Sequence, residues 1–217
     1  MEKIKIIVPL GKPCSGKDSF ANNLKEKYPH YEIVSTGQII RDAKTEGNTG
    51  RYYEYFKSDF ENVDKAKFAN DESINKVVAL EIQRHLQEGK TNLIFSGYPR
   101  NLKQLETFLE KIKSLNREFN IETNFFHFKV SDQTAHKRAE LRIENDIEHG
   151  KKIRSEDLGE NFQKRLDDYQ KKTFPLIEEL ENIGRITLIN ADEQTATEVF
   201  QEVMQHLEGY YPGKERR

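Results

Sequence analysis

Short apolar runs alternate along the chain with longer segments in which apolar residues recur every three or four positions. Short apolar runs separated by helical patterns are typical of a parallel β-sheet that is covered by helices on both faces. The pattern therefore predicts an α/β sandwich. Strands are expected at 4–8, 31–34, 92–95, 124–130 and 185–190, and helices at 17–27, 37–47, 71–89, 101–115, 132–148, 155–181 and 194–208.

Two polar segments do not fit this alternation, "EGNTGRYYEYFKSDFENVDKAK" at 46–67 and "ENDIEHGKKIRSED" at 144–157. Long connections of this kind in a compact domain are usually functional insertions. The aromatic residues of "RYYEYF" at 51–56 leave two alternatives open. They pack inside an inserted subdomain, or they contact a partner.

Length and composition narrow the class of protein. A chain of 217 residues can bury one sizeable core and is short for two, so we expect a single domain, 1–217, with insertions. The net charge of −2 gives no global basic field for nucleic acid or an anionic membrane surface. Without an N-terminal apolar segment or a run of 18 apolar residues, we expect a cytoplasmic protein with neither kind of partner. The single cysteine, Cys14, excludes an internal disulfide and a cysteine-based zinc site.

The stretch "GKPCSGKDS" at 11–19 directly follows the first apolar strand and opens a helix. It has the form G-x-x-x-x-G-K, in which backbone N–H groups and the lysine hold the phosphates of a nucleotide. Lys17 would oppose the helix dipole unless an anion bound there, so a phosphate site is the better interpretation. The residues expected to contact the phosphates are Gly11, Pro13, Cys14, Ser15, Gly16, Lys17, Asp18 and Ser19.

Three further stretches follow in order, "STGQIIR" at 35–41, "SGYPRNLKQ" at 96–104 and "RSEDLGENFQKRLDDYQKKTFPLI" at 154–177. With the phosphate loop, they resemble the motifs of the nucleoside monophosphate kinase family, most closely the adenylate kinases. The resemblance runs from residue 4 to about residue 208. It implies an α/β fold, a P-loop three-layer sandwich with a five-stranded parallel sheet. It also implies two inserts, an NMP-binding segment at 36–67 and a lid at 143–154 that lacks the long zinc-capable insertion.

Phosphoryl transfer brings many negative charges together and relies on positioning and electrostatic stabilisation, so arginines are expected at the site. Arg138 and Arg142 are four residues apart on a predicted helix, where like charges repel unless an anion lies beside them. Arg154 and Arg165 are eleven residues apart, close to three helical turns.

The resemblance assigns a role to each of six arginines: Arg41 and Arg100 hold the acceptor's α-phosphate, Arg138 stacks on the donor base, Arg142 meets the donor phosphates, and Arg154 and Arg165 bridge to the transferring group. The residues expected to act in catalysis are Lys17, Arg100, Arg142, Arg154 and Arg165. For Asp157 two roles remain open, orientation of one of these arginines or stabilisation of a helix start.

A glutamine amide offers a donor and an acceptor side by side, which suits the edge of adenine. Gln104 matches the adenine-reading position of the family, and Thr36 matches the adenylate kinase form, so the two favour AMP over UMP or CMP. The residues expected to bind the acceptor are Thr36, Gly37, Arg41, Gly97, Tyr98, Arg100, Gln104, Arg154 and Arg165.

Two positions depart from the family pattern. The acid that usually precedes G-[FY]-P-R is Ser96 here, and Asp18 stands where the family usually has glycine. Asp18 is therefore expected as a metal residue that orders or binds Mg²⁺ in place of the missing acid. The alternative is that Asp18 turns away and complements the helix dipole.

The first hypothesis is an enzyme that transfers the γ-phosphoryl group of MgATP to AMP and gives two ADP. It implies ATP as donor substrate, Mg²⁺, and a monomer whose partners are ATP, AMP and ADP. One alternative is a kinase for UMP, CMP or GMP, or one that uses GTP as donor. Another is a nucleotide-binding module that has lost catalysis, in which Asp18 repels phosphate.

Overall fold

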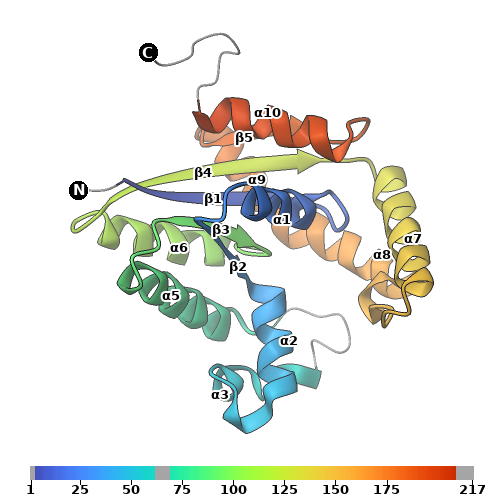
Figure 1. Cartoon of the computed structure of the whole chain (residues 1–217), viewed down its shortest axis with the longest axis horizontal. Helices are drawn as coiled ribbons and strands as arrows, with labels where there is room; N and C mark the ends of the chain where they lie inside the picture. The colour runs from blue at the N-terminus through green and yellow to red at the C-terminus, as the bar shows by residue number, and fades with distance from the viewer. Residues whose placement is uncertain (1–2, 62–68, 209–217) are drawn as a thin grey trace.

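The computed structural model describes residues 3–61 and 69–208 (Figure 1). Its sheet has the strand order β2-β3-β1-β4-β5, and every neighbouring pair is parallel. The α/β class and the position of each predicted strand are confirmed. The strands are β1 (Lys3–Gly11), β2 (Tyr31–Ser35), β3 (Asn92–Ser96), β4 (Asn120–Lys129) and β5 (Ile186–Asn190).

Helices connect the successive strands, as parallel pairing requires. They are α1 (Lys17–Lys27), α2 (Thr36–Glu46), α3 (Tyr53–Phe56), α5 (Asp71–Gln87), α6 (Leu102–Leu115), α7 (Asp132–Glu148), α8 (Gly159–Asp168), α9 (Phe174–Asn182) and α10 (Ala196–Glu208). The short turns are the 3₁₀ segments η1 (Gly47–Thr49) and η2 (Ser155–Asp157) and the π-helical segment η3 (Tyr169–Thr173). Across residues 3–61 and 69–208, every helix is too short or too polar to span a membrane.

The central strand β1 contributes to a hydrophobic core on each face of the sheet. Ile6 and Val8 belong to a buried cluster that also includes residues of α5, α6 and α9. Ile7 belongs to a second cluster with residues of α1 and α10. Successive side chains of a strand point to opposite faces, so an uninterrupted apolar run is required where both faces are covered. Because all neighbouring strands are parallel, their carboxyl ends lie at the same edge of the sheet, and the loops that follow them can form a site there.

The helix predicted over 155–181 is confirmed from Gly159 onward, where α8, η3 and α9 follow one another without a break, and is wrong for its first residues, where η2 and Leu158 stand apart. The chain forms η2, α8, η3 and α9 in succession. Leu158 has an extended backbone (φ −90°, ψ 130°), which separates η2 from α8. Pro175 has no N–H to donate to the preceding turn. Just before it, the N–H of Phe174 bonds to the carbonyl of Tyr169, five residues back, which gives the wider π-helical turn.

The first insertion lies beside α5, and α2 and α3 project from the sheet there (Figure 1). Tyr52 and Phe56 are buried in the cluster that includes α5. The Tyr52 hydroxyl donates a hydrogen bond to the Glu81 carboxylate of α5. Packing within the domain is thus the role that the structure favours for these aromatics. The end of this predicted insertion, 62–67, lies outside the described residues.

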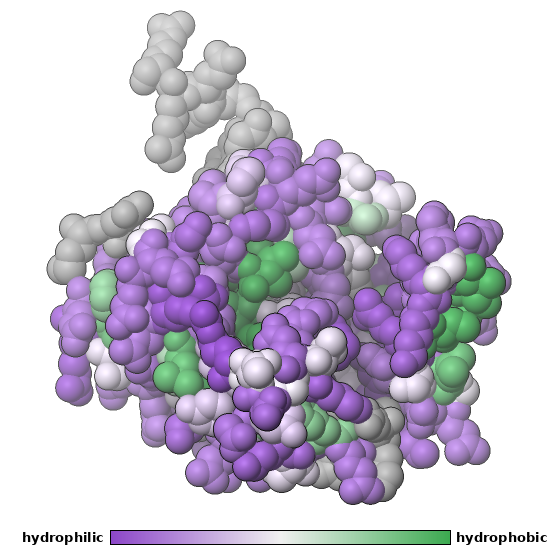
Figure 2. All heavy atoms as spheres, turned by 60° about the horizontal axis from the view of Figure 1, so that its bottom comes forward, coloured by the Kyte–Doolittle hydropathy of each residue, from purple (hydrophilic) through white to green (hydrophobic). Residues whose placement is uncertain are grey.

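The second insertion begins as helix, because α7 continues to Glu148. Gly150 then adopts φ 62°, a left-handed conformation that glycine accepts without steric cost. Three large apolar side chains near this segment are exposed: Leu141 by 54%, Ile147 by 60% and Leu158 by 46%. Figure 2 shows a mostly hydrophilic face with apolar atoms near its right-hand edge.

Candidate active site

The phosphate loop leaves β1 at Gly11 and enters α1 at Lys17. Gly11 has φ 146°, and a Cβ atom there would lie 2.5 Å from the carbonyl oxygen of Phe128 on β4. Gly16 precedes α1 in a left-handed conformation with φ 96°. Glycine is thus required at the start of the loop by close packing, and it suits the end by backbone conformation.

Lys17 folds back over the loop. Its Nζ donates to the carbonyls of Gly11 at 2.8 Å and Lys12 at 2.5 Å, and to the Ser15 hydroxyl at 3.0 Å. Burial lowers the pKa of Lys17 to about 8. These three partners carry no charge, so an anion that entered the loop would stabilise the ammonium group.

Arg100 is presented by the turn that follows β3. Its Nε donates to the carbonyl of Gly97 at 2.7 Å, and the Thr36 hydroxyl donates to the same carbonyl at 2.9 Å. Gly97 has φ 77°, and a Cβ atom there would lie 2.8 Å from Nη2 of Arg100. Burial, followed by the charge of Arg165, lowers the pKa of Arg100 to about 10. This guanidinium group is therefore placed where a negative ligand would be stabilised.

A single buried carboxylate joins two of the predicted catalytic arginines. Asp157 accepts from Nη2 of Arg142 at 2.5 Å and from Nη1 of Arg165 at 3.0 Å, and its side chain is 1% exposed. Of the two roles left open by the sequence, the structure shows contact with the arginines, and with two rather than one. The Nη2 atom of Arg142 also lies 3.1 Å from Sγ of Cys14, so the cluster touches the phosphate loop.

Two pockets meet at Lys17. The larger, about 550 Å³, lies between the phosphate loop, α1 and α7, and it includes Asp18, Arg138 and Arg142. The smaller, about 80 Å³, is lined by the loop, by the turn that presents Arg100 and by the segment from Arg165 to Thr173. The larger pocket is within the size range of small-molecule sites.

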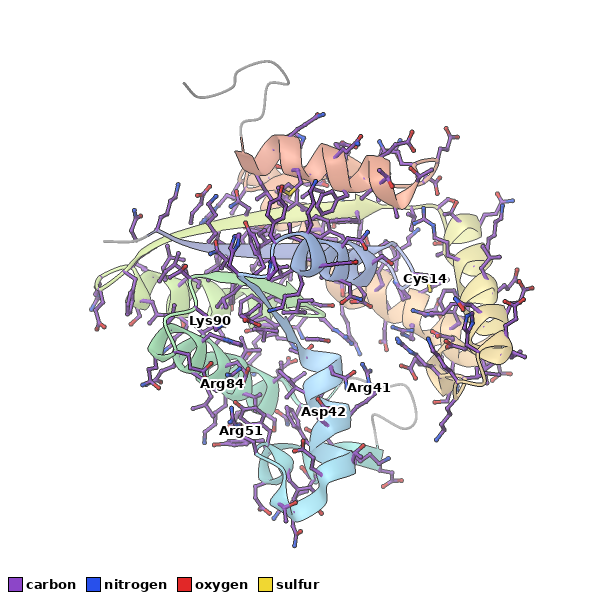
Figure 3. The ribbon with its side chains drawn as sticks, in the orientation of Figure 1. Cys14, Arg41, Asp42, Arg51, Arg84 and Lys90 are labelled. Atoms are coloured by element: carbon purple, nitrogen blue, oxygen red, sulfur yellow. The ribbon has the colours of Figure 1, made fainter. Side chains whose placement is uncertain are left out.

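Of the other predicted residues, Arg138 and Tyr98 line these pockets, whereas Arg41 and Arg154 do not. Arg138 donates to the carbonyl of Ala191 at 2.7 Å, and Tyr98 lines the smaller pocket. Arg41 donates to the side chain of Gln38 at 2.8 Å. It lies on α2, and Cys14 lies on the phosphate loop (Figure 3). Arg154 is exposed just before η2. Among the described residues that line these two pockets, neither Arg41 nor Arg154 occurs.

Gln104 is buried, with 1% of its surface exposed, and its amide already has partners. Its Oε1 accepts from the backbone N–H of Arg100 at 2.8 Å, and its Nε2 donates to Asp71 at 2.6 Å. Asp71 also accepts from the Asn101 amide at 3.0 Å. Sequence reasoning missed Asp71, because its only local signal is that of an acid in the first turn of a helix.

Comparison with known proteins agrees with this arrangement. The family model described as "Adenylate kinase" matches residues 9–185. The chain belongs to the adenylate kinase family. The similarity includes the adenylate kinase of Sinorhizobium medicae, 30% identical over 203 residues, which cover 91% of this chain and 98% of that protein. The adenylate kinase of Bartonella bacilliformis is 30% identical over 187 residues, 85% of this chain and 90% of that protein. That of Agrobacterium fabrum is 27% identical over 201 residues, 92% and 97% of the two chains.

Membership of the adenylate kinase family confirms the resemblance found in the motifs. The matched region begins before the phosphate loop and ends after α9, so it includes the smaller pocket, the Asp157 cluster and the part of the larger pocket formed by the phosphate loop, α1 and α7. The two departures from the adenylate kinase pattern also prove to be neighbours, because the Ser96 hydroxyl donates a hydrogen bond to the Asp18 carboxylate.

Proposed function

We propose that this chain is an ATP:AMP phosphotransferase, which transfers the γ-phosphoryl group of ATP to AMP and gives two ADP. The observation that carries the proposal is the meeting of two pockets at Lys17, beside arginines that share one carboxylate. A donor in the larger pocket and the phosphate group of an acceptor in the smaller would meet at this point. Such a site acts by positioning and charge stabilisation rather than by covalent chemistry.

Each cation then has a distinct task. Lys17 exchanges its loop partners for donor phosphate oxygens, and the backbone N–H groups at the start of α1 add the positive end of the helix dipole. Arg142 contacts the donor phosphates and Arg165 the transferring group, both held by Asp157. Arg100, on the acceptor side, holds the α-phosphate of AMP. Charge that develops during transfer is thus met by donors already in place.

The other predicted residues complete the two subsites. On the donor side these are Gly11, Pro13, Cys14, Ser15, Gly16, Asp18, Ser19 and Arg138, and on the acceptor side Thr36, Gly37, Arg41, Gly97, Tyr98, Gln104 and Arg154. The Asp18 carboxylate, which lines the donor pocket and accepts a hydrogen bond from Ser96, suits Mg²⁺. When bound, this ion neutralises phosphate charge.

Within one domain, the NMP-binding segment 36–67 would contribute to the acceptor subsite, and the lid 143–154 would close over the donor. The exposed apolar side chains of Leu141, Ile147 and Leu158 support a closing motion, since closure would remove part of this surface from water. Exclusion of water would also protect the donor from hydrolysis.

The test is a transfer assay with ATP or GTP as donor and AMP, UMP, CMP or GMP as acceptor. ATP with AMP should give the highest kcat/KM. Lys17→Met and Arg100→Ala should each lower transfer at least about 100-fold, about 2.7 kcal/mol of transition-state stabilisation, without loss of the fold. The exposed Lys113→Met and Arg185→Ala serve as matched controls. Nucleotide binding without transfer in the unmodified protein would refute the proposal.

A further inference from the structure

Asp18 is a carboxylate in a pocket otherwise suited to phosphate. It lies in the first turn of α1, directly after Lys17, and it lines the larger pocket. The pocket also contains Arg138 and Arg142. An acid in this position has to be explained, because it repels each negative charge of a nucleotide that enters.

The side chain of Asp18 does not turn away from the sheet. The Ser96 hydroxyl, at the carboxyl end of β3, donates a hydrogen bond to its Oδ1. Asp18 is an exposed residue that also lines the larger pocket, so its carboxylate can be reached by a ligand there. The carboxylate is thus held in place through Oδ1, with its second oxygen not engaged by Ser96.

The surrounding donors fit one kind of metal site. Within residues 3–61 and 69–208, there is no group of three or more His, Cys, Asp or Glu side chains that could hold a metal ion. A cation here would therefore be bound by one carboxylate together with phosphate oxygens and water. This is the coordination that Mg²⁺ commonly adopts with nucleotides. Phosphate loops usually place a hydroxyl that reaches Mg²⁺ directly after the lysine, the position that Asp18 occupies.

We propose that Asp18, oriented by Ser96, binds a divalent cation on the donor nucleotide, directly or through one of its waters, and so selects metal-bound over metal-free triphosphate. Without the cation the carboxylate repels the phosphates; with the cation between them the interaction becomes attractive. Asp18 then determines specificity for the metal-bound nucleotide. The inference rests on the proposed donor pocket, and it concerns binding rather than turnover.

The experiment measures ATP affinity by calorimetry, in EDTA and in excess Mg²⁺, for the unmodified protein, Asp18→Asn, Ser96→Ala and a control, Glu26→Gln. Glu26 is an exposed acid on the same helix, α1. The unmodified protein and the control should bind MgATP at least about tenfold more tightly than metal-free ATP. Asp18→Asn should bind metal-free ATP about tenfold more tightly than the unmodified protein does, and should lose most of the preference for MgATP. Ser96→Ala should show a smaller shift in the same direction.

Two further measurements keep the test decisive. Mn²⁺ affinity of the ATP complex, followed by electron paramagnetic resonance, should fall in Asp18→Asn and not in Glu26→Gln. In a double-mutant cycle, Asp18→Gly alone should lose the metal preference, and the double variant with Ser96→Asp should regain it. The double variant again has a carboxylate beside position 18. If Asp18→Asn keeps the preference and the Mn²⁺ affinity, the proposal is overturned and Asp18 only complements the helix dipole. Absence of transfer in the unmodified protein would instead refute the proposed function.

Discussion

Asp157→Asn tests whether one buried carboxylate positions the two arginines that we propose to act in catalysis, Arg142 and Arg165. Asp157 accepts from Arg142 at 2.5 Å and from Arg165 at 3.0 Å. A hydrogen bond to a charged partner contributes about 1.5–3 kcal/mol and one to a neutral partner about 0.5–1.5 kcal/mol. Asparagine keeps the shape and one acceptor oxygen but loses the charge. We therefore expect a loss of about 1–1.5 kcal/mol for each arginine, or about 2–3 kcal/mol for the pair.

If this loss falls on the transition state, kcat should decrease about 30–150-fold. Affinity for ATP should stay the same or improve, since the substitution removes a negative charge near the phosphate pocket. The assay combines ADP formation with calorimetric Kd values for ATP. The control is Asp167→Asn on α8, an exposed acid that pairs with Gln163. A kcat within threefold of the unmodified protein would refute the reasoning. So would an unchanged kcat with a weakened Kd, because the arginines would then act in ground-state binding alone.

Three other results are expected. Because the pKa of Lys17 is about 8 in the free protein and an anion raises it, ATP binding should take up about 0.1 proton at pH 7 and close to one proton at pH 9. Calorimetry in buffers of different ionisation enthalpy measures this uptake, which Lys17→Met should abolish. Tyr52→Phe removes the hydrogen bond to the Glu81 carboxylate and should lower the unfolding free energy by about 1.5–3 kcal/mol in denaturant titrations, whereas Tyr55→Phe should have a small effect. Gln104→Ala should raise the KM for AMP more than that for ATP, and equal increases would contradict its assignment to the acceptor side.

The helices and strands could be predicted from the sequence where the local pattern and the tertiary environment agree. The predicted bounds of α1 and α7 match the structure, because a glycine and a serine stand before their first turns and the apolar positions repeat at helical spacing. The segment 155–181 departs from one regular α-helix for a physical reason. Its periodicity continues across Leu158, where the backbone is extended, and through the turn before Pro175, where the hydrogen bonds widen to π-helical spacing. A side-chain pattern therefore predicts which face is buried more reliably than it predicts an unbroken hydrogen-bond ladder.

The candidate site, too, could be predicted only in part. Motif spacing identified Lys17, Arg100 and the arginines of α7 and α8, since each lies at a fixed offset from a strand end or a helix start. Contacts between side chains far apart in the sequence could not be predicted from it. Asp71 and Gln104 are separated by 33 residues, and Asp18 and Ser96 by 78. No local pattern encodes such pairs, because the tertiary arrangement brings them together: α5 packs against α6, and β3 lies beside β1.

The neutral partners of Lys17 have a consequence for the lifetime of the folded chain. In the free protein this partly buried ammonium group is held by carbonyls and a hydroxyl, and its pKa is lowered. A ligand that binds only the folded form stabilises it by about 2.7 kcal/mol at a concentration of 100 times Kd. The nucleotide is then a reversible part of the structure as well as a reactant. A cell rich in nucleotide would keep this protein folded, and one depleted of nucleotide would expose more of it to proteases.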